Sequence, residues 1–273
     1  MKRRLGSLIL HAVLLAGAAL TVAPLLWMVS ASLMPTGAAN TAPPPLLPSR
    51  VTFEHYIELF THLDLTRPFL NSLLVSVVGT LLTLLTSSAA GYAFAKLRFP
   101  GREGLFRLLL AAMLVPAQVG MLPLFLMLKS LGLVNTYAGV LVPWLASVFG
   151  IFLVRQYALA IPDDLLDSAR LDGATEARVF GSVVLPNLAP VLATLAVFVF
   201  MSSWNDFLWP LVMMSDERHY TLPVALASLV GEHVQDTELM MAGAVVTVLP
   251  VLFVFIVLQR WYIRGVMAGS VKG

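Results

Sequence analysis

The chain has 273 residues, of which 59% are hydrophobic and 12% charged, and it contains no cysteine. This composition has too few polar groups to cover a soluble domain, and it excludes a disulfide framework or a thiolate metal site. The net charge of +2 is explained better by a bias of Lys and Arg toward one side of a membrane than by nucleic-acid binding. The sequence therefore predicts a membrane protein.

Six apolar segments have the length, about 20 residues or more, that crosses a hydrocarbon core of about 30 Å. They run approximately over residues 8–33, 69–95, 105–128, 134–154, 188–213 and 239–258. We expect an all-α membrane protein in which residues 1–273 form a single transmembrane domain.

Basic residues divide unequally between the two sides of the predicted bundle. Thirteen of the 17 Lys and Arg residues fall at the two ends of the chain and in the second and fourth connections. Because short basic loops stay in the cytoplasm, both termini are predicted to be cytoplasmic. The Lys2-Arg3-Arg4 start could instead open a cleavable secretory signal, but its removal would leave five spans and put the basic tail on the wrong side.

The outer connections are unequal. Five prolines between residues 35 and 50 favour an extended strap over a helix. After it, Phe53, Tyr56, Ile57 and Phe60 recur at helical spacing, which predicts a short amphipathic helix at the outer surface or a packed surface helix. The last outer connection, residues 215–238, is acidic and long enough to contact an external partner.

Small residues recur along the second span. Gly79, Thr83, Ser87, Gly91 and Ala95 are spaced every fourth residue, which places them on one helix face. Such a stripe allows two helix backbones to approach closely, although small residues are common in any membrane helix. We expect a helix contact here, with a neighbour either in this chain or in another subunit.

Two further spans contain polar residues at or near membrane depth. Pro116 and Pro123 must break the hydrogen bonds of the third span, and Gln118 between them lines a solute path or bonds another helix. Near the end of the fifth span, Asn205 and Asp206 lie between tryptophans. They form either a polar rim of a translocation path or part of an interfacial belt.

A polar island, residues 162–186, separates the fourth and fifth spans. Asp163 and Asp164 favour the first turn of a short helix, and Gly173 is placed to end it in a left-handed conformation. Thr175 can then cap a second short helix that runs through Phe180. The result is a compact knob that suits a protein socket and has no feature of a catalytic site. Its small or apolar contacts would be Ala169, Leu171 and Ala174.

The island resembles the signature of ABC-importer permeases, which reads Glu-Ala-Ala, then Asp-Gly-Ala, then Ile-x-Leu-Pro. This chain has Asp167-Ser168-Ala169, Asp172-Gly173-Ala174 and Val183-Val184-Leu185-Pro186, so aspartate, serine and valine replace three signature residues. Residues 131–137, 204–210 and 259–273 resemble the MalG-like branch, which imports carbohydrates. The resemblance implies the type I fold of six transmembrane helices, with a cytoplasmic coupling helix between helices 4 and 5.

The resemblance also implies which residues act. Those expected to couple to an ATPase are Asp167, Ala169, Leu171, Asp172, Gly173, Ala174 and Phe180. Those of a tail that contacts the ATPase are Gly269, Ser270, Val271, Lys272 and Gly273. Candidates for the translocation path are Gln118, Asn205 and Asp206, and candidates for contact with a binding protein are Tyr220, Pro223, Gly231 and Glu232.

The implied function is that of an inner-membrane permease subunit, which forms half of the path of an ATP-driven sugar importer. The chain has no phosphate-binding loop, so we expect no catalytic residue, metal or cofactor in it, and ATP and Mg are used by a partner. The expected partners are a MalF-like second permease, two ATPase subunits, an external solute-binding protein, a sugar and membrane lipid, but no nucleic acid. The alternatives are an ion-coupled secondary transporter and, less favoured, a membrane enzyme; neither a midplane carboxylate with a partner nor a metal-ligand cluster is evident from the sequence.

Overall fold

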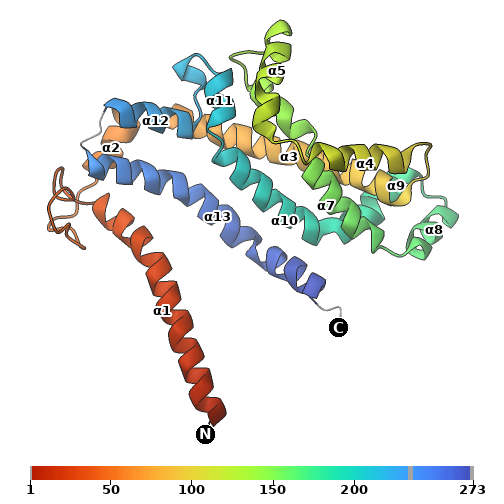
Figure 1. Cartoon of the computed structure of the whole chain (residues 1–273), viewed down its shortest axis with the longest axis horizontal. Coiled ribbons are helices and arrows are strands. Elements are labelled where there is room, and N and C mark those ends of the chain that lie inside the picture. Colours follow the sequence, from red (N-terminus) through yellow and green to blue (C-terminus); the bar gives the residue numbers. More distant parts are fainter. Residues whose placement is uncertain (1, 233–235, 271–273) are drawn as a thin grey trace. The chain divides into compact units, whose positions relative to one another are not determined.

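The structure is a computed structural model that describes residues 2–232 and 236–270, with side chains described for 6, 7, 9–228 and 236–259. All regular structure in these residues is helical, as the fold-class prediction requires. Helices satisfy their backbone hydrogen bonds internally, which a bilayer demands. The helices in Figure 1 are α1 (Lys2–Ala31), α2 (Glu54–Thr61), α3 (Thr66–Lys96), α4 (Arg102–Ala112), α5 (Ala117–Ser130), α6 (Tyr137–Leu141), α7 (Val148–Leu159), α8 (Asp163–Leu171), α9 (Glu176–Val179), α10 (Leu185–Trp204), α11 (Leu208–Met213), α12 (Leu222–Glu232) and α13 (Thr237–Ser270), with 3-10 turns η1 (Val142–Leu145) and η3 (Glu217–His219) and a π turn η2 (Phe180–Val184).

Within the described residues, five helical runs are long and apolar enough to cross a membrane, and a sixth exists if α4 and α5 count as one broken span. These two helices meet at an angle of 103°. Pro116, which lacks an N–H, precedes the first residue of α5, so the break lies where the sequence predicts one. The third span expected at residues 105–128 is therefore two helices instead of one.

The fifth span is shifted relative to its expected bounds of 188–213. Helix α9, η2 and α10 form one run from Glu176 to Trp204, so the second short helix predicted after Gly173 is instead the base of a long span. The run ends at Trp204, and α11 follows as a separate helix. Pro210 explains the end, because in a continuous helix its ring would meet the carbonyl group of Asp206.

The chain forms two compact units where the sequence predicts one domain. Unit 1 comprises Met1–Thr66 with Ala225–Pro250, and unit 2 comprises Arg67–Val224 with Val251–Gly273. In unit 1, residues 35–50 contain no helix, as expected, but they form turns and bends where the sequence predicts an extended strap. The short helix predicted near residue 53 is α2, which buries His55 and Leu59 and leaves Phe53 and Ile57 exposed.

The stripe of small residues on α3 packs within unit 2. A Cβ atom added to Gly91 would lie 2.6 Å from Cγ1 of Val154 on α7, which is closer than packed carbon atoms allow. One and two turns earlier on α3, Ser87 lies against Gly150 of α7 and the Thr83 hydroxyl donates a 2.6 Å hydrogen bond to the carbonyl oxygen of Trp144. The neighbour of the stripe is thus α7 and η1 of this chain, which the sequence left open.

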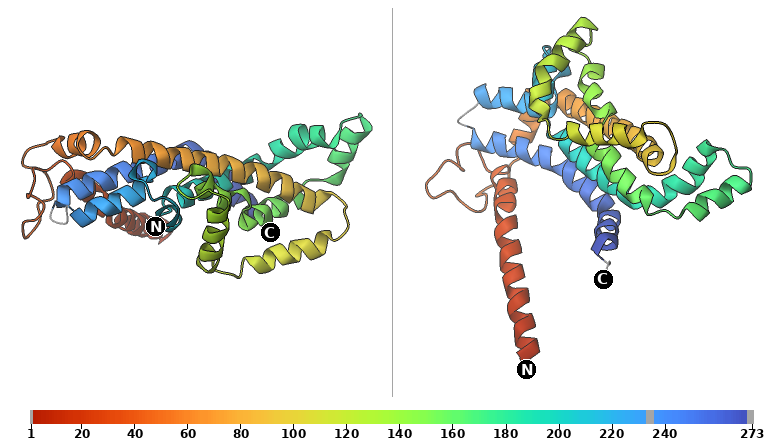
Figure 2. Two further views of the ribbon diagram at one scale, coloured as in Figure 1. Left: turned by 90° about the horizontal axis from the view of Figure 1, so that it is seen from above. Right: turned by 45° about the vertical axis from the view of Figure 1, so that its right-hand side comes forward.

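Figures 1 and 2 show α8 and the turn that follows it at one extremity of unit 2, next to the end of α3. A core cluster that includes Ile161, Leu166, Val179 and Leu188 runs from α8 into α10. Because Leu166 is buried in this cluster, α8 is fixed to the end of the bundle and is not a free arm.

Candidate functional site

The polar island folds into the helix and bend that its residues predict. Asp163 lies in the first turn of α8, where the helix dipole favours a carboxylate. At the other end the amide of Ala174 donates to the carbonyl of Ala169 at 3.0 Å, and the amide of Gly173 donates to that of Arg170 at 2.9 Å. These two bonds form a Schellman motif, and Gly173 has the left-handed φ of 81° that the motif requires.

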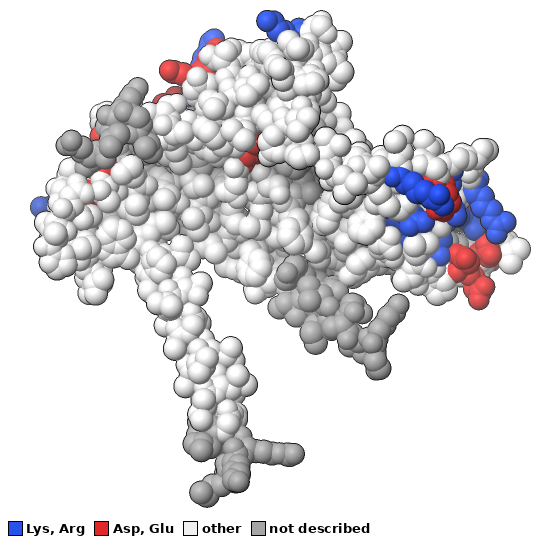
Figure 3. Space-filling model, in the orientation of Figure 1, with Lys and Arg blue, Asp and Glu red and all other residues white. Residues whose placement is uncertain are grey.

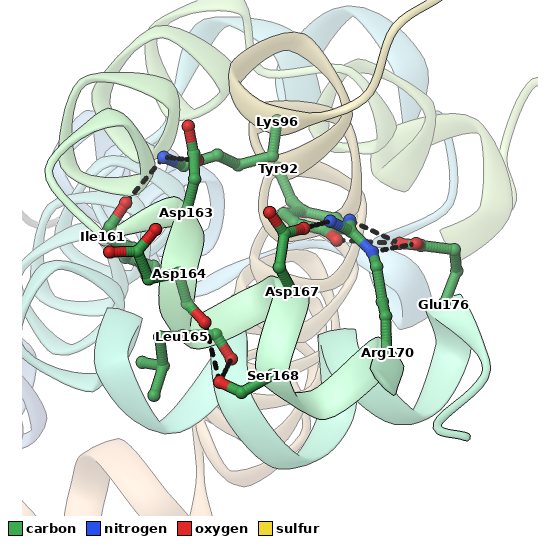
Figure 4. A network of polar contacts seen from close by, with 10 residues as sticks. All are labelled: Tyr92, Lys96, Ile161, Asp163, Asp164, Leu165, Asp167, Ser168, Arg170 and Glu176. Carbon is green, nitrogen blue, oxygen red and sulfur yellow. Dashed lines mark hydrogen bonds and ion pairs between the residues drawn. The ribbon is translucent and has the colours of Figure 1, made fainter. Parts of the chain in front are cut away.

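Arg170 fastens the bend to the helix that follows it (Figure 4). Its Nε donates to Oε1 of Glu176 at 2.7 Å, and its Nη1 donates to Oδ1 of Asp167 at 2.8 Å. The hydroxyl of Tyr92 on α3 donates to Oε2 of the same glutamate at 2.9 Å. The hydrogen bond to Glu176, followed by that to Asp167, raises the pKa of the Arg170 guanidinium. The bend is therefore tied to α9 and through Glu176 to α3.

Lys96, the last residue of α3, holds the opposite end of α8. Its Nζ donates to the carbonyl of Ile161 at 2.6 Å and to Oδ1 of Asp163 at 2.7 Å (Figure 4). The lysine side chain is only 7% exposed, whereas that of Asp163 is 75% exposed. The hydrogen bond and the positive charge of Lys96 lower the pKa of the Asp163 carboxyl. Two polar anchors thus join α8 to α3, one at each end of the short helix.

The residues predicted for ATPase coupling separate into two groups. Leu171 is 89% exposed at the tip of the bend, beside the exposed Asp172 and Gly173, and Asp167 is exposed one turn back. Ala169, Ala174 and Phe180 pack against the core cluster instead. Their role in the structure is to hold the bend in place, and the ring of Phe180 lies 5.6 Å from that of Tyr92.

The surface around α8 is rich in charged side chains (Figure 3). On the face drawn in Figure 3, Lys, Arg, Asp and Glu gather over this end, and the adjoining helical surface is uncharged. An exposed leucine surrounded by charged groups gives the tip both an apolar contact and polar contacts. Such a surface suits a protein partner, because apolar cores with polar rims are typical of interfaces.

Sequence reasoning missed the anchoring residues Tyr92, Lys96, Arg170 and Glu176. Arg170 has a local signal, because it stands three residues after Asp167 on one helix face and in the last turn of α8. Tyr92 and Lys96 have none, since they lie 84 and 67 residues from the carboxylates that they contact.

A cavity of about 360 Å³ in unit 2 brings two of the proposed path residues together. Gln118 enters it from the first turn of α5 and Asp206 from the break between α10 and α11, with the indoles of Trp144 and Trp209 in the lining. Asp206 also caps α11, since its Oδ1 accepts from the amide of Trp209 at 3.4 Å. Asn205 is absent from this lining, and its side chain donates to the carbonyl of Met201 at 2.8 Å.

Of the residues predicted for binding-protein contact, the structure describes the side chains of only Tyr220 and Pro223. Tyr220 is half-buried, packs against the cluster around Val75, and its carbonyl accepts from the side-chain amide of Asn71 at 2.9 Å. Pro223 is half-buried in the first turn of α12. The side chains of Gly231, Glu232 and the tail Gly269–Gly273 lie outside those that the structure describes.

Asn135, from the stretch that resembles the MalG-like branch, organises the segment before Tyr220. It adopts a left-handed φ of 60°, and its Oδ1 accepts from the amides of Ser215 and Asp216, both at 3.2 Å. Thr136 then caps α6, and the Tyr137 hydroxyl donates to Oδ1 of Asn71 at 2.7 Å. Hydrogen bonds from this stretch therefore connect α6 to α3 and to residues 213–220.

Three comparisons place this architecture among known proteins. Residues 63–267 match the family described as "Binding-protein-dependent transport system inner membrane component". The arabinooligosaccharide transport system permease protein AraQ of Halalkalibacterium halodurans is 39% identical over 93% of this chain and 92% of its own length. The lactose transport system permease protein LacG of Rhizobium radiobacter is 35% identical over 100% of this chain and 98% of its own. A chain in the crystal structure of a bacterial ABC transporter that imports the polysaccharide alginate matches with a TM-score of 0.82 and 26% identity, over 96% of this chain and 98% of that one.

Proposed function

The chain belongs to the family of binding-protein-dependent transport system inner membrane components, and from this membership we propose that it imports a sugar or oligosaccharide as one half of a two-permease translocation path. Members of the family are the multi-pass permease subunits of ATP-driven importers, which are transport components and not the hydrolytic ones. The single observation that carries the proposal is the family match over residues 63–267, and the doubly anchored bend after α8, with Leu171 exposed at its tip, supports coupling to an ATPase.

The bend suits the transmission of force from an ATPase. A coupling element must have different contacts in two states and must move the helices behind it as a body. Arg170 and Lys96 tie α8 to its neighbours at both ends, and η2 joins α9 directly to α10. Displacement of the tip would therefore be passed to α3 and α10. We assign the socket to an ATPase subunit that binds and hydrolyses ATP with Mg, because this chain has no phosphate-binding loop.

The cavity suits a sugar better than an ion. Ligand sites combine mainly apolar walls with a few polar groups that fix orientation, and indole rings offer flat apolar faces to the C–H faces of a sugar ring. Trp144 and Trp209 supply such faces, while Gln118 and Asp206 supply hydrogen-bonding groups. The names of AraQ and LacG, transporters of arabinooligosaccharides and lactose, support a carbohydrate.

The remaining partners follow from the family and from exposed surfaces. Helix α1 has apolar side chains along its length and none of its membrane-crossing window is buried in the chain, so it needs lipid or the second, MalF-like permease as a neighbour. We assign contact with the external solute-binding protein to the region of Tyr220, Pro223, Gly231 and Glu232, and a second ATPase contact to the tail Gly269–Gly273. Both termini are then cytoplasmic, as the distribution of basic residues predicts.

The first experiment tests the socket. The chain has no cysteine, so Leu171→Cys introduces the only thiol of this chain, at the tip. In the assembled transporter, a photoactivatable reagent attached to this thiol should cross-link the position to an ATPase subunit. The matched control is Lys129→Cys, which is also exposed but stands at the end of α5, and it should give no ATPase cross-link. Labelling of Leu171→Cys by an impermeant reagent from outside intact cells would contradict the assignment.

The second experiment tests the class of transporter and identifies its substrate. Purified transporter in proteoliposomes, with ATP inside and no ion gradient, should take up sugar that its binding protein delivers. Uptake that needs a proton or sodium gradient and proceeds without ATP would support the secondary transporter instead. Capture of the binding protein with its bound ligand, followed by mass spectrometry, names the sugar.

A further inference from the structure

Three acceptor groups converge in unit 1 at a place that the transport function does not use. His55 and Glu58 lie on α2, and Asp236 immediately precedes α13. One ligand atom from each of the three side chains lies within 4.8 Å of the others. His55 and Glu58 are three residues apart and therefore share one face of α2. From this geometry we propose that His55, Glu58 and Asp236 form a binding site for a divalent transition-metal ion of the zinc type.

The histidine supplies the strongest argument. His55 is fully buried, and its Nε2 lies 2.9 Å from the carbonyl oxygen of Met34. A carbonyl oxygen can only accept, so Nε2 carries a proton, and Nδ1 is the ring nitrogen that can bind a metal ion. This buried Nδ1 has no hydrogen-bond partner among the described residues. A ring nitrogen whose opposite N–H is held by a backbone carbonyl is the usual arrangement of a metal-bound histidine.

The two carboxylates supply oxygen atoms as further possible ligands. Oδ1 of Asp236 accepts from the amide of Leu239 at 2.9 Å, which fixes the carboxylate at the start of α13 and leaves its other oxygen free to bind. Among the ion pairs of the described residues, none involves Glu58 or Asp236. Two carboxylate oxygens within 4.8 Å of one another, with no Lys or Arg partner among the described residues, repel each other. A cation between them removes this repulsion.

The donor set indicates which class of ion binds. One imidazole nitrogen and two carboxylate oxygens suit Zn²⁺ or Co²⁺, whereas Ca²⁺ and Mg²⁺ prefer oxygen ligands throughout. Bonds of about 2.0–2.2 Å would place ligand atoms roughly 3.4 Å apart in a tetrahedral site. The ligand atoms now lie within 4.8 Å of one another, so binding would draw them closer together, and Glu58 and Asp236 are half-buried. Water can occupy the fourth position.

The backbone around the site is already fixed. The amide of Ala39 donates to Oε1 of the buried Glu238 at 2.6 Å, and the Thr237 hydroxyl donates to Oδ1 of Asn40. The start of α13 is therefore attached to the segment after α1, and Met34 of the same segment holds His55. A bound ion would add the missing link between α2 and α13 and would stabilise unit 1.

Cobalt is the probe, because Co²⁺ occupies zinc sites and gives a visible absorption band whose intensity reports coordination. The assembled transporter, free of nucleotide and stripped with a chelator, is titrated with Co²⁺. We expect one equivalent per copy of this chain to bind, and Zn²⁺ to displace it. Loss of one ligand in Glu58→Gln or Asp236→Asn should weaken binding by at least roughly 10- to 100-fold. Asparagine at position 236 still caps α13, which separates loss of a ligand from loss of the helix start.

The matched control is Glu54→Gln, which removes an exposed carboxylate one turn earlier on the same helix and should bind Co²⁺ like the natural chain. All variants share the same ATPase subunits, so metal bound by those subunits cancels in the comparison. A thermal midpoint raised by Zn²⁺ in the natural transporter and unmoved in Glu58→Gln gives an independent readout. The absence of stoichiometric Co²⁺ binding, or equal binding by Glu58→Gln and the natural chain, would overturn the proposal.

Discussion

Substitution of Gly173 tests whether the bend after α8 transmits ATP hydrolysis to transport. Gly173 has a φ of 81°, and a Cβ atom added there would meet nothing within 4 Å. A larger residue therefore causes no clash, and its only cost is the left-handed backbone, about 1–2 kcal/mol for an ordinary L-residue. A β-branched residue such as valine costs more, and asparagine costs less because it adopts this conformation readily.

This strain is large enough to change the population of the bend. A cost of about 1–2 kcal/mol shifts a two-state equilibrium by a factor of roughly 5–30. The ratio of open to closed Schellman bonds at Ala174 and Gly173 would rise by that factor, and Leu171 would leave its position at the tip in the open molecules. We expect the coupling of transport to hydrolysis to fall in the order glycine, asparagine, alanine, valine.

The assay is the ratio of sugar transported to ATP hydrolysed in proteoliposomes that contain the assembled transporter. Gly173→Asn should stay near the natural ratio, and Gly173→Val should lose most of it, while both insert into the membrane in normal amounts. A natural ratio in Gly173→Val would refute the reasoning. A loss in Gly173→Asn as severe as that in Gly173→Val would show that side-chain size at the socket matters, and that the conformation of the bend does not.

Three other outcomes follow from packing and charge. Gly91→Ala should lower the free energy of unfolding in detergent by about 1–3 kcal/mol, because the new methyl group lies 2.6 Å from a carbon of α7. Gly104→Ala, which adds a methyl group in open space, should leave this free energy unchanged. Lys96 lowers the pKa of Asp163 in the folded state, so their ion pair stabilises the fold fully above the ordinary aspartate pKa of about 3.9. This contribution is lost as the pH falls below that value. The difference in melting temperature between the natural chain and Asp163→Asn should therefore disappear at low pH. Asp206→Ala should reduce sugar uptake more than it reduces assembly, measured by co-purification of the ATPase, and normal uptake would limit Asp206 to its capping role.

Local chemistry predicts the parts of the site that depend on neighbouring residues in the chain. A glycine that follows two helical turns and is itself followed by a capping threonine marks the bend, and both Gly173 and Thr175 adopt the expected conformations. Pro116 marks the break before α5 for an equally local reason, since it lacks an N–H. Pro210 gives the same local signal for the end of α10, but the predicted fifth span continued past it to Met213.

Contacts between distant segments could not be predicted in this way. The sequence shows a stripe of small residues on α3 but does not say that Gly91 packs on Val154, and it gives no reason to pair Tyr92 with Glu176. It also treats Ala169 and Leu171 alike, although one packs inward and the other is almost fully exposed. The direction of each side chain depends on which helix lies beside it.

The sequence by itself determined the membrane class, the approximate spans and the bend, because apolar length, proline and glycine act through the local backbone. Only the tertiary structure decided how α8 is anchored, which residues meet in the cavity, and that His55, Glu58 and Asp236 converge. Those results require helices from remote parts of the chain to pack in one particular arrangement. That arrangement depends on the fit of many side chains at once, which no single stretch of residues contains.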